Sequence, residues 1–196
     1  MPMTTADSGV AAGLVMLGDG RVVQIRPIVA GDADGLVDLH RRCSPQSRYL
    51  RFQSPKPQLR PAEAAYLADA DGTDRVALVA TTVEDGEERI VADARVEPTA
   101  TGDGEVALLV RDDLQGLGLG RRLLTLLIHA GACRGQRRLL LYVLAENEAM
   151  LTLASEFDAD PIGSNGDVTL LAIVVKQVVP GPVSRRHRQL TSSSLG

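Results

Sequence analysis

The sequence predicts an α/β fold in which helices cover one mixed, mostly antiparallel sheet. Short runs rich in β-branched residues alternate with helical patterns along most of the 196 residues. The turn signal Asp85-Gly86 joins two of these runs as a hairpin, which requires antiparallel pairing. Between residues 105 and 145, a strand, a glycine-rich turn, a helix and a second strand follow one another, as in a parallel crossover.

Length and composition indicate one globular domain and exclude several kinds of partner. A chain of 196 residues buries roughly 70% of the surface that it exposes when unfolded, so its core needs no metal or disulfide. Aromatic residues make up only 3%, which argues against binding single-stranded nucleic acid by base stacking. The net charge of −4 argues against a duplex-DNA partner, and no apolar run is long enough to span a membrane.

The cysteines and histidines point to a reducing compartment without a metal site. Cys43 and Cys133 form no CxxC motif, which is typical of reduced thiols in a cytoplasmic protein. The three histidines are scattered along the chain, so we expect no zinc site. The N-terminus lacks the basic region of a signal peptide, in agreement with a cytoplasmic location.

The N-terminal half contains an expected leader, a strand, three helices and a hairpin. Residues 1–18 are expected to form a flexible leader. Ser44 followed by Pro45 has the pattern of an N-cap and a first helical residue. Tyr49, Arg51 and Phe52 of that helix are interpreted as packing residues that set the turn between helices, with lining of a groove as the alternative. The predicted elements are a strand over 21–28, helices after Asp32, after Ser44 and from Pro61, and strands over 75–83 and 89–96.

The C-terminal half contains the expected crossover and a last strand. Five leucines and alanines recur on one face of the stretch 119–133, which predicts an amphipathic helix. The tail over 177–196 is basic and is expected to be disordered. The predicted elements are strands over 105–110 and 138–145, a helix over 147–157, a loop over 158–167 and a strand over 168–175.

A glycine-rich turn between the strand 105–110 and the helix 119–133 predicts an anion site. Gly116, Gly118 and Gly120 allow the chain to curl so that several backbone N–H groups point into one concavity. The start of the following helix adds unpaired N–H groups and a positive dipole end. The turn is therefore suited to a phosphate or pyrophosphate.

The spacing of these glycines matches neither common nucleotide motif. The dinucleotide pattern G-x-G-x-x-G fails from Gly116 and from Gly118, and no Gly-Lys-Ser/Thr follows as in a P-loop. Gln115, Gly118 and Gly120 instead form Q-x-x-G-x-G, which resembles the pyrophosphate loop of the GNAT acyl-CoA N-acyltransferase superfamily. Asn147 follows the next strand and starts the next helix, at the place of the Asn that these proteins use beside pantetheine.

Three further stretches narrow the resemblance to one branch of the superfamily. R-P-I at 26–28, S-P-Q-S-R-Y-L-R-F at 44–52 and A-D-A-R at 92–95 are similar to bacterial protein-lysine acetyltransferases and to related domains fused to acyl-CoA synthetases. The resemblance implies a single domain over 19–176, a parallel strand pair that splays apart and helices on both faces of the sheet. It also implies acetyl-CoA as co-substrate and a protein lysine, such as one on an acyl-CoA synthetase, as acceptor.

The same resemblance implies a role for each candidate site residue. Backbone groups of Leu109 and Val110 would meet pantetheine, and Asn147 would meet its other side. Glu105 would act as the base that deprotonates the amine. The alternative is that Glu105 is only a solvent-exposed residue at the start of a strand. Ala154 stands where many members of the superfamily carry a Tyr that protonates the thiolate. The pyrophosphate would be held at Gln115, Gly116, Leu117, Gly118, Leu119, Gly120 and Arg121.

The expected activity is N-acetyl transfer from acetyl-CoA to an amine by direct attack. A protonated amine cannot attack a thioester, so the site needs a base within hydrogen-bond reach. Two other functions stay open at this point. One keeps the chemistry and takes a small-molecule amine as acceptor; the other is an acyl-CoA-binding regulatory module without turnover, which the Ala at 154 would suit.

Overall fold

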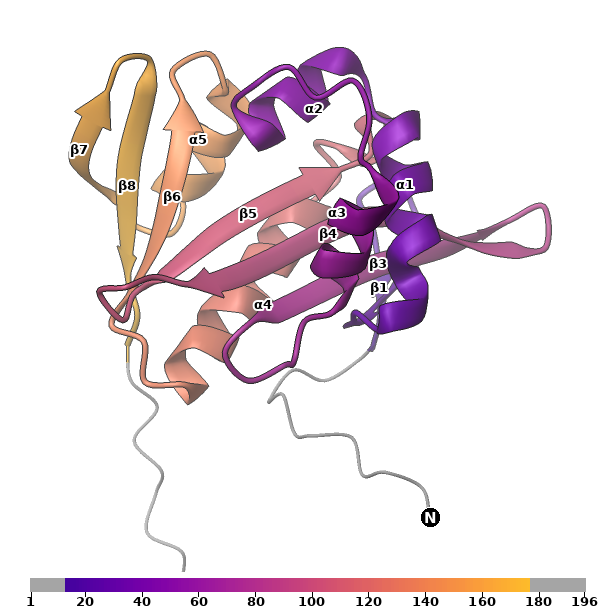
Figure 1. Cartoon of the computed structure of the whole chain (residues 1–196), viewed down its shortest axis with the longest axis horizontal. Helices are drawn as coiled ribbons and strands as arrows, with labels where there is room; N and C mark the ends of the chain where they lie inside the picture. The colour runs from indigo at the N-terminus through magenta and orange to yellow at the C-terminus, as the bar shows by residue number, and fades with distance from the viewer. Residues whose placement is uncertain (1–12, 177–196) are drawn as a thin grey trace, which may run out of the picture.

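A computed structural model describes residues 13–176, and these residues form one eight-stranded sheet with helices on both faces (Figure 1). The strand order is β1-β2-β3-β4-β5-β6-β8-β7, and every neighbouring pair is antiparallel except β5 and β6. This mixed, mostly antiparallel sheet confirms the predicted fold class. Residues 1–12 of the expected leader and the expected tail over 177–196 lie outside the described residues.

The strands follow the apolar runs of the sequence closely. The alternation of buried side chains along β3 shows why: Leu78 and Ala80 pack on one face, whereas Ala77 and Val79 pack on the other. The strands are β1 (Gly13–Met16), β2 (Val22–Pro27), β3 (Val76–Glu84), β4 (Glu87–Pro98), β5 (Gly104–Val110), β6 (Arg138–Leu144), β7 (Asp160–Asn165) and β8 (Val168–Val174).

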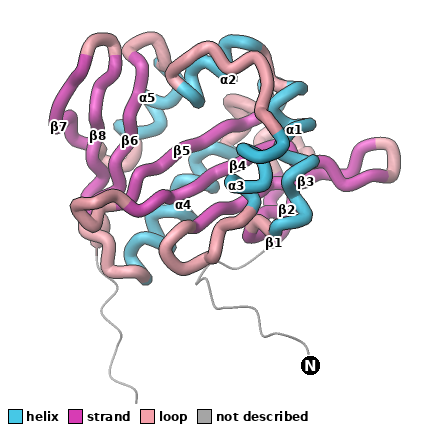
Figure 2. The backbone as a smooth tube through the Cα atoms, viewed as in Figure 1, coloured by secondary structure: helices cyan, strands magenta, loops and turns pink. Residues whose placement is uncertain are grey.

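Helices cover both faces of the sheet (Figure 2). Their apolar stripes pack against it. The stripe of α4 includes Leu119, Leu123 and Leu127, all of them fully buried against the face that α5 also covers. Leu36 and Leu39 of α1 and Ala64 of α3 pack on the opposite face. The helices are α1 (Ala33–Arg42), α2 (Pro45–Phe52), α3 (Pro61–Ala68), α4 (Leu119–Cys133) and α5 (Glu148–Ser155), with short 3₁₀ turns η1 (Ala30–Asp32) and η2 (Asp112–Leu114).

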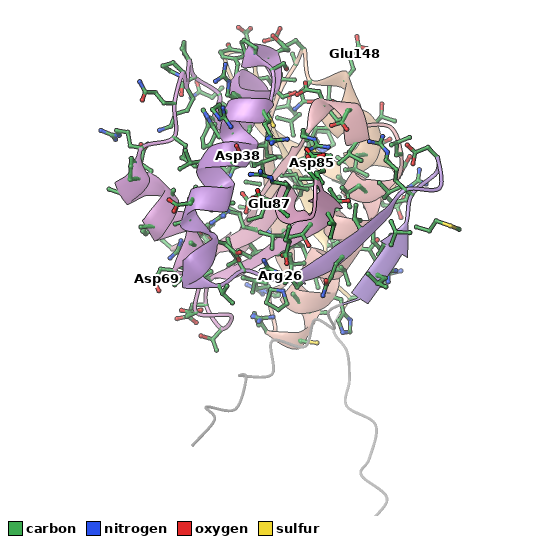
Figure 3. The ribbon with its side chains drawn as sticks, turned by 90° about the vertical axis from the view of Figure 1, so that its right-hand side faces the viewer. Arg26, Asp38, Asp69, Asp85, Glu87 and Glu148 are labelled. Carbon is green, nitrogen blue, oxygen red and sulfur yellow. The ribbon has the colours of Figure 1, made fainter. Side chains whose placement is uncertain are left out.

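The hairpin between β3 and β4 forms where the sequence predicts it. Asp85 and Gly86 both have positive φ angles, 53° and 80°, which is the conformation of a two-residue type I′ turn. Figure 3 looks onto the tip of this hairpin, where Asp85 and Glu87 lie. The hairpin tip extends beyond the edge of the sheet, on the side away from β6 and α5 (Figure 1).

Two strands correct the sequence interpretation. Gly13–Met16 is not part of a flexible leader but forms β1, which pairs with β2 in four residue pairs. Asp160–Asn165 lies in the stretch predicted as a loop but forms β7, which pairs with β8. Both are edge strands and are largely exposed. An edge strand is held mainly by backbone hydrogen bonds on one side, so it leaves little hydrophobic alternation in the sequence.

The parallel pair β5–β6 splays apart, as the resemblance implies. Only Gly104 with Leu139 and Glu105 with Leu140 are paired, at the start of β5. Beyond Glu105 the two strands diverge, and α2 and α5 lie at the open end (Figure 1). The edge of β5 that faces this opening therefore has backbone N–H and C=O groups without a strand partner.

Candidate active site

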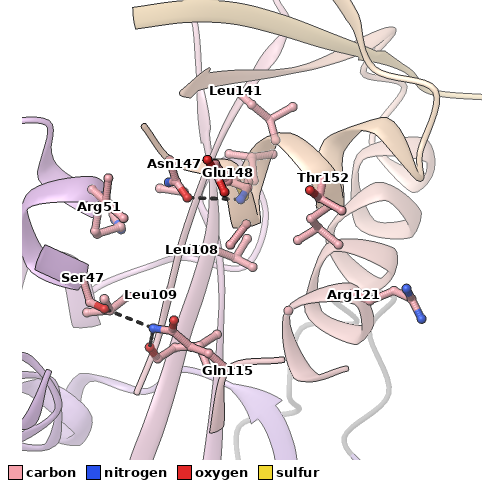
Figure 4. A pocket seen from close by; sticks show the side chains of 18 of the residues that line it. Ser47, Arg51, Leu108, Leu109, Gln115, Arg121, Leu141, Asn147, Glu148 and Thr152 are labelled. Carbon is pink, nitrogen blue, oxygen red and sulfur yellow. Dashed lines mark hydrogen bonds between the residues drawn. The ribbon is translucent and has the colours of Figure 1, made fainter. Parts of the chain in front are cut away.

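A pocket of about 820 Å³ occupies the opening between β5 and β6 (Figure 4). The turn before α4 and the first turns of α5 form one part of its wall, and the C-terminal half of α2 forms another. Most of the predicted site residues line it: Glu105, Leu109, Val110, Gln115, Gly116, Gly118, Gly120, Arg121 and Asn147.

The turn before α4 presents its backbone to the pocket. Gly116 and Gly118 have φ angles of 73° and 88°, which L side chains rarely adopt, and a Cβ atom at either position would meet nothing within 4 Å. Glycine is therefore required here by backbone conformation rather than by crowding. Among residues 13–176, no backbone hydrogen bond uses the N–H groups of residues 116–121. These successive free amides stand at the positive end of α4, as an anion site requires.

Leu117 and Leu119 contribute differently from the glycines beside them. Their side chains do not line the pocket: Leu119 is buried in the core, and Leu117 packs against that core. The carbonyl oxygen of Leu117 also accepts a hydrogen bond of 3.2 Å from the N–H of Gly18. These two leucines fix the turn to the core, so only their backbone N–H groups remain for a ligand.

Gln115 braces the site with its side chain. Its Nε2 donates to the carbonyl oxygen of Val110 at 2.9 Å and to Oγ of Ser47 at 3.1 Å. The amide group therefore joins the end of β5, the glycine turn and α2 (Figure 4). Both donor hydrogens of the Gln115 amide have protein acceptors, so its side chain positions the turn instead of supplying a donor to the pocket.

Asp112 fixes α2 to the same turn. Its carboxylate accepts hydrogen bonds from the N–H and Oγ of Ser44, at 2.8 and 2.6 Å, and from Oγ of Ser47 at 2.7 Å. Ser44 also caps α2, because its Oγ accepts from the N–H of Ser47 at 3.1 Å. Burial acts to raise the pKa of Asp112, but the hydrogen bonds from the two serines outweigh it and hold the pKa below its usual value.

Arg121 and Asn147 stand on the two helices that border the pocket. Arg121 is largely exposed and forms a two-bond ion pair with Glu156, at 2.7 and 2.6 Å. Hydrogen bonds to Glu156 raise the pKa of Arg121. Asn147 caps α5: its Oδ1 accepts from the N–H of Met150 at 3.1 Å. Neither residue is buried, so the Arg121 charge and the Asn147 amide nitrogen remain near the pocket.

Glu105 lies in the pocket without a cationic partner. It is exposed, and no described residue forms an ion pair with it within 4 Å. Glu97 stands opposite it on β4, but Arg75 engages the Glu97 carboxylate at 2.7 and 3.1 Å. Arg51 attracts the Glu105 carboxylate without forming an ion pair within 4 Å, so this carboxylate can still meet a cation from solvent.

The side of the pocket formed by α2 contains residues that sequence reasoning missed or undervalued. Arg51 and Phe52 line the pocket rather than serving only as packing residues, whereas Tyr49 does not line it. Gln53 at the end of α2 donates from Nε2 to the carbonyl oxygen of Tyr142 on β6 at 2.6 Å, so it spans the opening. Ser47 and Arg51 belong to the stretch 44–52 that carries the resemblance, which is the signal that indicates them. Nothing in the sequence marks Gln53 or Tyr142.

Two further findings concern metals and membranes. No group of three or more His, Cys, Asp or Glu side chains within residues 13–176 is placed to hold a metal ion. Over the same residues, no helix has the length and apolar character needed to cross a membrane.

Comparison with known proteins finds acetyltransferases among the relatives of this chain. The chain is 36% identical over 138 residues to Acetyltransferase PA5475 of Pseudomonas aeruginosa, covering 70% of this chain and 74% of that protein. It is 32% identical over 147 residues to Acetyltransferase Pat of Mycolicibacterium smegmatis, covering 74% of this chain and 43% of that protein. The crystal structure of the GNAT domain of S. lividans PAT matches with a TM-score of 0.75 and 30% identity, covering 83% of this chain and 96% of that one.

A family-wide match gives the same result. The model of the Acetyltransferase (GNAT) family matches residues 34–157, which include the glycine turn, α4, β6 and α5. This match extends over more than half of the chain. The chain therefore belongs to the GNAT acetyltransferase family, whose members are acyl-CoA-dependent acyltransferases.

Proposed function

We propose that this protein is an N-acetyltransferase that transfers acetyl from acetyl-CoA to the ε-amine of a protein lysine. The observation that carries the proposal is one pocket that combines the free amides of residues 116–121 with the unpaired Glu105 carboxylate. The amides suit an anionic cofactor, and the carboxylate suits a cationic acceptor. An acetyl-CoA-dependent transfer to an amine needs both.

The cofactor end is proposed to be built from backbone. The diphosphate would accept hydrogen bonds from the N–H groups of residues 116–121, with Arg121 adding positive charge beside it. Pantetheine would lie along the unpaired edge of β5 beyond Glu105, where a strand partner is missing. Asn147 at the start of α5 would face it from the other side.

The reaction is proposed to be a direct attack assisted by Glu105. The carboxylate of Glu105 takes a proton from the ammonium group, and the freed amine forms a bond to the thioester carbonyl carbon. Backbone N–H groups around Leu109 and Val110 would stabilise the negative charge that develops on the oxygen. The attacking nitrogen then loses its second proton to water, the carbon–sulfur bond breaks, and coenzyme A leaves as a thiolate that takes up a proton. Ala154 is fully buried and has no hydroxyl, so that proton comes from another donor or from water.

Support for a lysine acceptor comes from particular stretches of the chain. The segments 44–52 and 92–95 resemble those of bacterial protein-lysine acetyltransferases; the first contributes side chains to the pocket, and the second pairs with β5. The relatives named above carry the names Acetyltransferase Pat and PAT. We propose a cytoplasmic location, which the free thiols of Cys43 and Cys133 suit.

The test has two stages. Acetyl-CoA should raise the melting temperature, because a ligand that binds only the folded state stabilises it. Thiol release is then measured with lysine peptides, small amines and polyamines. Preferred turnover of lysine peptides supports the proposal, whereas preferred turnover of small amines assigns a small-molecule acceptor. Tight binding of acetyl-CoA with no turnover on any amine contradicts catalysis and favours a regulatory module.

A further inference from the structure

Arg51 is a nearly buried cation that lines the pocket without a hydrogen bond. Its side chain is 12% exposed, and its Nε is inaccessible to solvent and has no partner. Arg51 forms an ion pair with the Asp93 carboxylate at 3.9 Å and a cation–π contact with the Phe52 ring, with 4.9 Å from guanidinium carbon to ring centroid. Figure 4 shows Arg51 on α2, across the pocket from Arg121.

Asp93 is too far from Arg51 for a hydrogen bond, and its carboxylate is held by a second arginine. Arg95 is buried and donates to both oxygens of Asp93, at 2.6 and 3.2 Å, and a further nitrogen of Arg95 donates to the carbonyl oxygen of Leu67 at 3.1 Å. A buried charge without hydrogen bonds is costly, so such groups are normally paired. The arrangement therefore leaves a guanidinium at the pocket wall without a hydrogen bond: the Asp93 carboxylate lies at ion-pair distance, and the charges of Glu105 and Glu97 act on Arg51 only through space.

A carboxylate is the group that best completes this site. The planar guanidinium offers parallel N–H donors that match two carboxylate oxygens, and burial strengthens such a pair. Arg51 and Glu105 line the same pocket, so an acceptor can place its amine at Glu105 and an acid at Arg51. We propose that Arg51 forms a carboxylate subsite for the acceptor, so that an amine with an acidic group nearby is preferred. This inference rests on the proposed acetyl transfer.

The first experiment compares matched acceptor peptides. Lysine peptides that differ only in Asp or Asn beside the lysine are assayed by thiol release with acetyl-CoA. The parent should use the Asp peptide with a kcat/KM about tenfold or more higher, the effect of one charge-assisted pair. Arg51→Gln should bring this ratio close to one, and Arg51→Lys should retain part of it. Arg41→Gln is the control, because Arg41 is exposed on α1 and lies outside the pocket.

A purely structural role for Arg51 gives a different result. If Arg51 only anchors α2 near Asp93, Arg51→Gln will slow the Asp and Asn peptides equally, and the subsite is overturned. Ethylguanidinium added to Arg51→Ala should restore the preference for the Asp peptide, which a loss of packing would not allow. If the variants do not fold, the parent decides: equal use of both peptides overturns the subsite.

Two further measurements are needed. One tells whether the carboxylate belongs to the acceptor or to the acyl group, and the other tests the subsite independently of the acetyl transfer. Succinyl-CoA carries its carboxylate on the acyl group, so an Arg51-dependent preference for succinyl-CoA over acetyl-CoA would overturn the assignment to the acceptor. Calorimetric titration of the parent with the Asp and Asn peptides measures binding without turnover. Tighter binding of the Asp peptide that depends on Arg51, with no thiol release, supports the subsite and rejects the acetyl transfer. Equal turnover of the Asp and Asn peptides supports the acetyl transfer and overturns the subsite.

Discussion

The two ends of the pocket are built from different materials. At the turn before α4, backbone amides of residues 116–121 face the pocket, and the nearby side chains of Leu117 and Leu119 belong to the core. At the α2 end, the groups that face the pocket are side chains, Arg51 and Glu105 among them. Binding by backbone amides depends on the conformation of the turn, whereas binding by side chains depends on which residues the fold brings together. Changes at the two ends should therefore affect different quantities.

The largest effect on turnover should come from Glu105→Gln at the α2 end of the pocket. Loss of the base should reduce kcat at least about a hundredfold, because proton removal must precede attack. The affinity for acetyl-CoA, measured by calorimetry, should stay within about twofold. Glu87→Gln at the hairpin tip is the control and should leave both unchanged (Figure 3). Unchanged turnover in Glu105→Gln would reject this residue as the base.

At the other end, Gly118→Ala should weaken the cofactor. Its φ of 88° strains any side chain by about 1–2 kcal/mol, and relaxation of this strain would turn amides away from the pocket. We expect the Kd for acetyl-CoA to rise about tenfold or more. Gly86→Ala is a matched control, because Gly86 has a φ of 80° and open space but lies in the hairpin. If both variants change the Kd equally, the turn has no special role.

Asp112→Asn tests how the two ends are joined. The hydrogen bonds of the Asp112 carboxylate to Ser44 and Ser47 should contribute about 1 kcal/mol at pH 7, a modest value because this residue is exposed. Because the pKa of Asp112 is lowered in the folded state, this contribution is complete above the unfolded pKa and disappears as the pH falls through the folded pKa.

Urea unfolding of the parent and Asp112→Asn at several pH values measures this difference. The two proteins should differ at pH 7 and converge toward pH 2. A difference that stays constant over this range would show that the carboxylate charge does not stabilise the junction between α2 and the turn.

The smallest effect is expected for Arg121→Gln. Arg121 is largely exposed and paired with Glu156, so solvent weakens its attraction to a phosphate. The Kd for coenzyme A should rise about two- to fivefold, and less at high salt. Arg122→Gln changes the neighbouring exposed arginine, which does not line the pocket, and should have no effect. Equal effects of the two variants would indicate a general charge effect.

The sequence predicts the backbone end better than the side-chain end, for a physical reason. The glycines of the turn and the apolar face of α4 are local patterns, and α4 has the same limits, Leu119 to Cys133, that the periodicity predicts. The contact of Arg51 with Asp93 and that of Gln53 with Tyr142 join residues far apart in the chain. No local pattern specifies such contacts, so their geometry required the structure.

The elements that the sequence analysis missed follow the same rule. β7 contains Pro161 and Gly163 and is exposed throughout, so neither propensity nor alternation identifies it. β1 is short and is recognised only through its pairing with β2. The sequence predicts Gln115 among the cofactor-binding residues, and in the structure its side-chain amide donates hydrogen bonds to Val110 and Ser47. The bond to Ser47 depends on the position of α2, which no local pattern specifies.

The short pairing of β5 with β6 has a consequence for cooperativity. Within the sheet, only two residue pairs join strands β1–β5 to the three-stranded group made of β6, β8 and β7. A molecule bound between β5 and β6 would hold these two groups of strands together. In the ligand-free chain, amide hydrogen exchange in β6, β8 and β7 would then proceed through local opening. Saturation with coenzyme A would slow this exchange toward the rate of global unfolding.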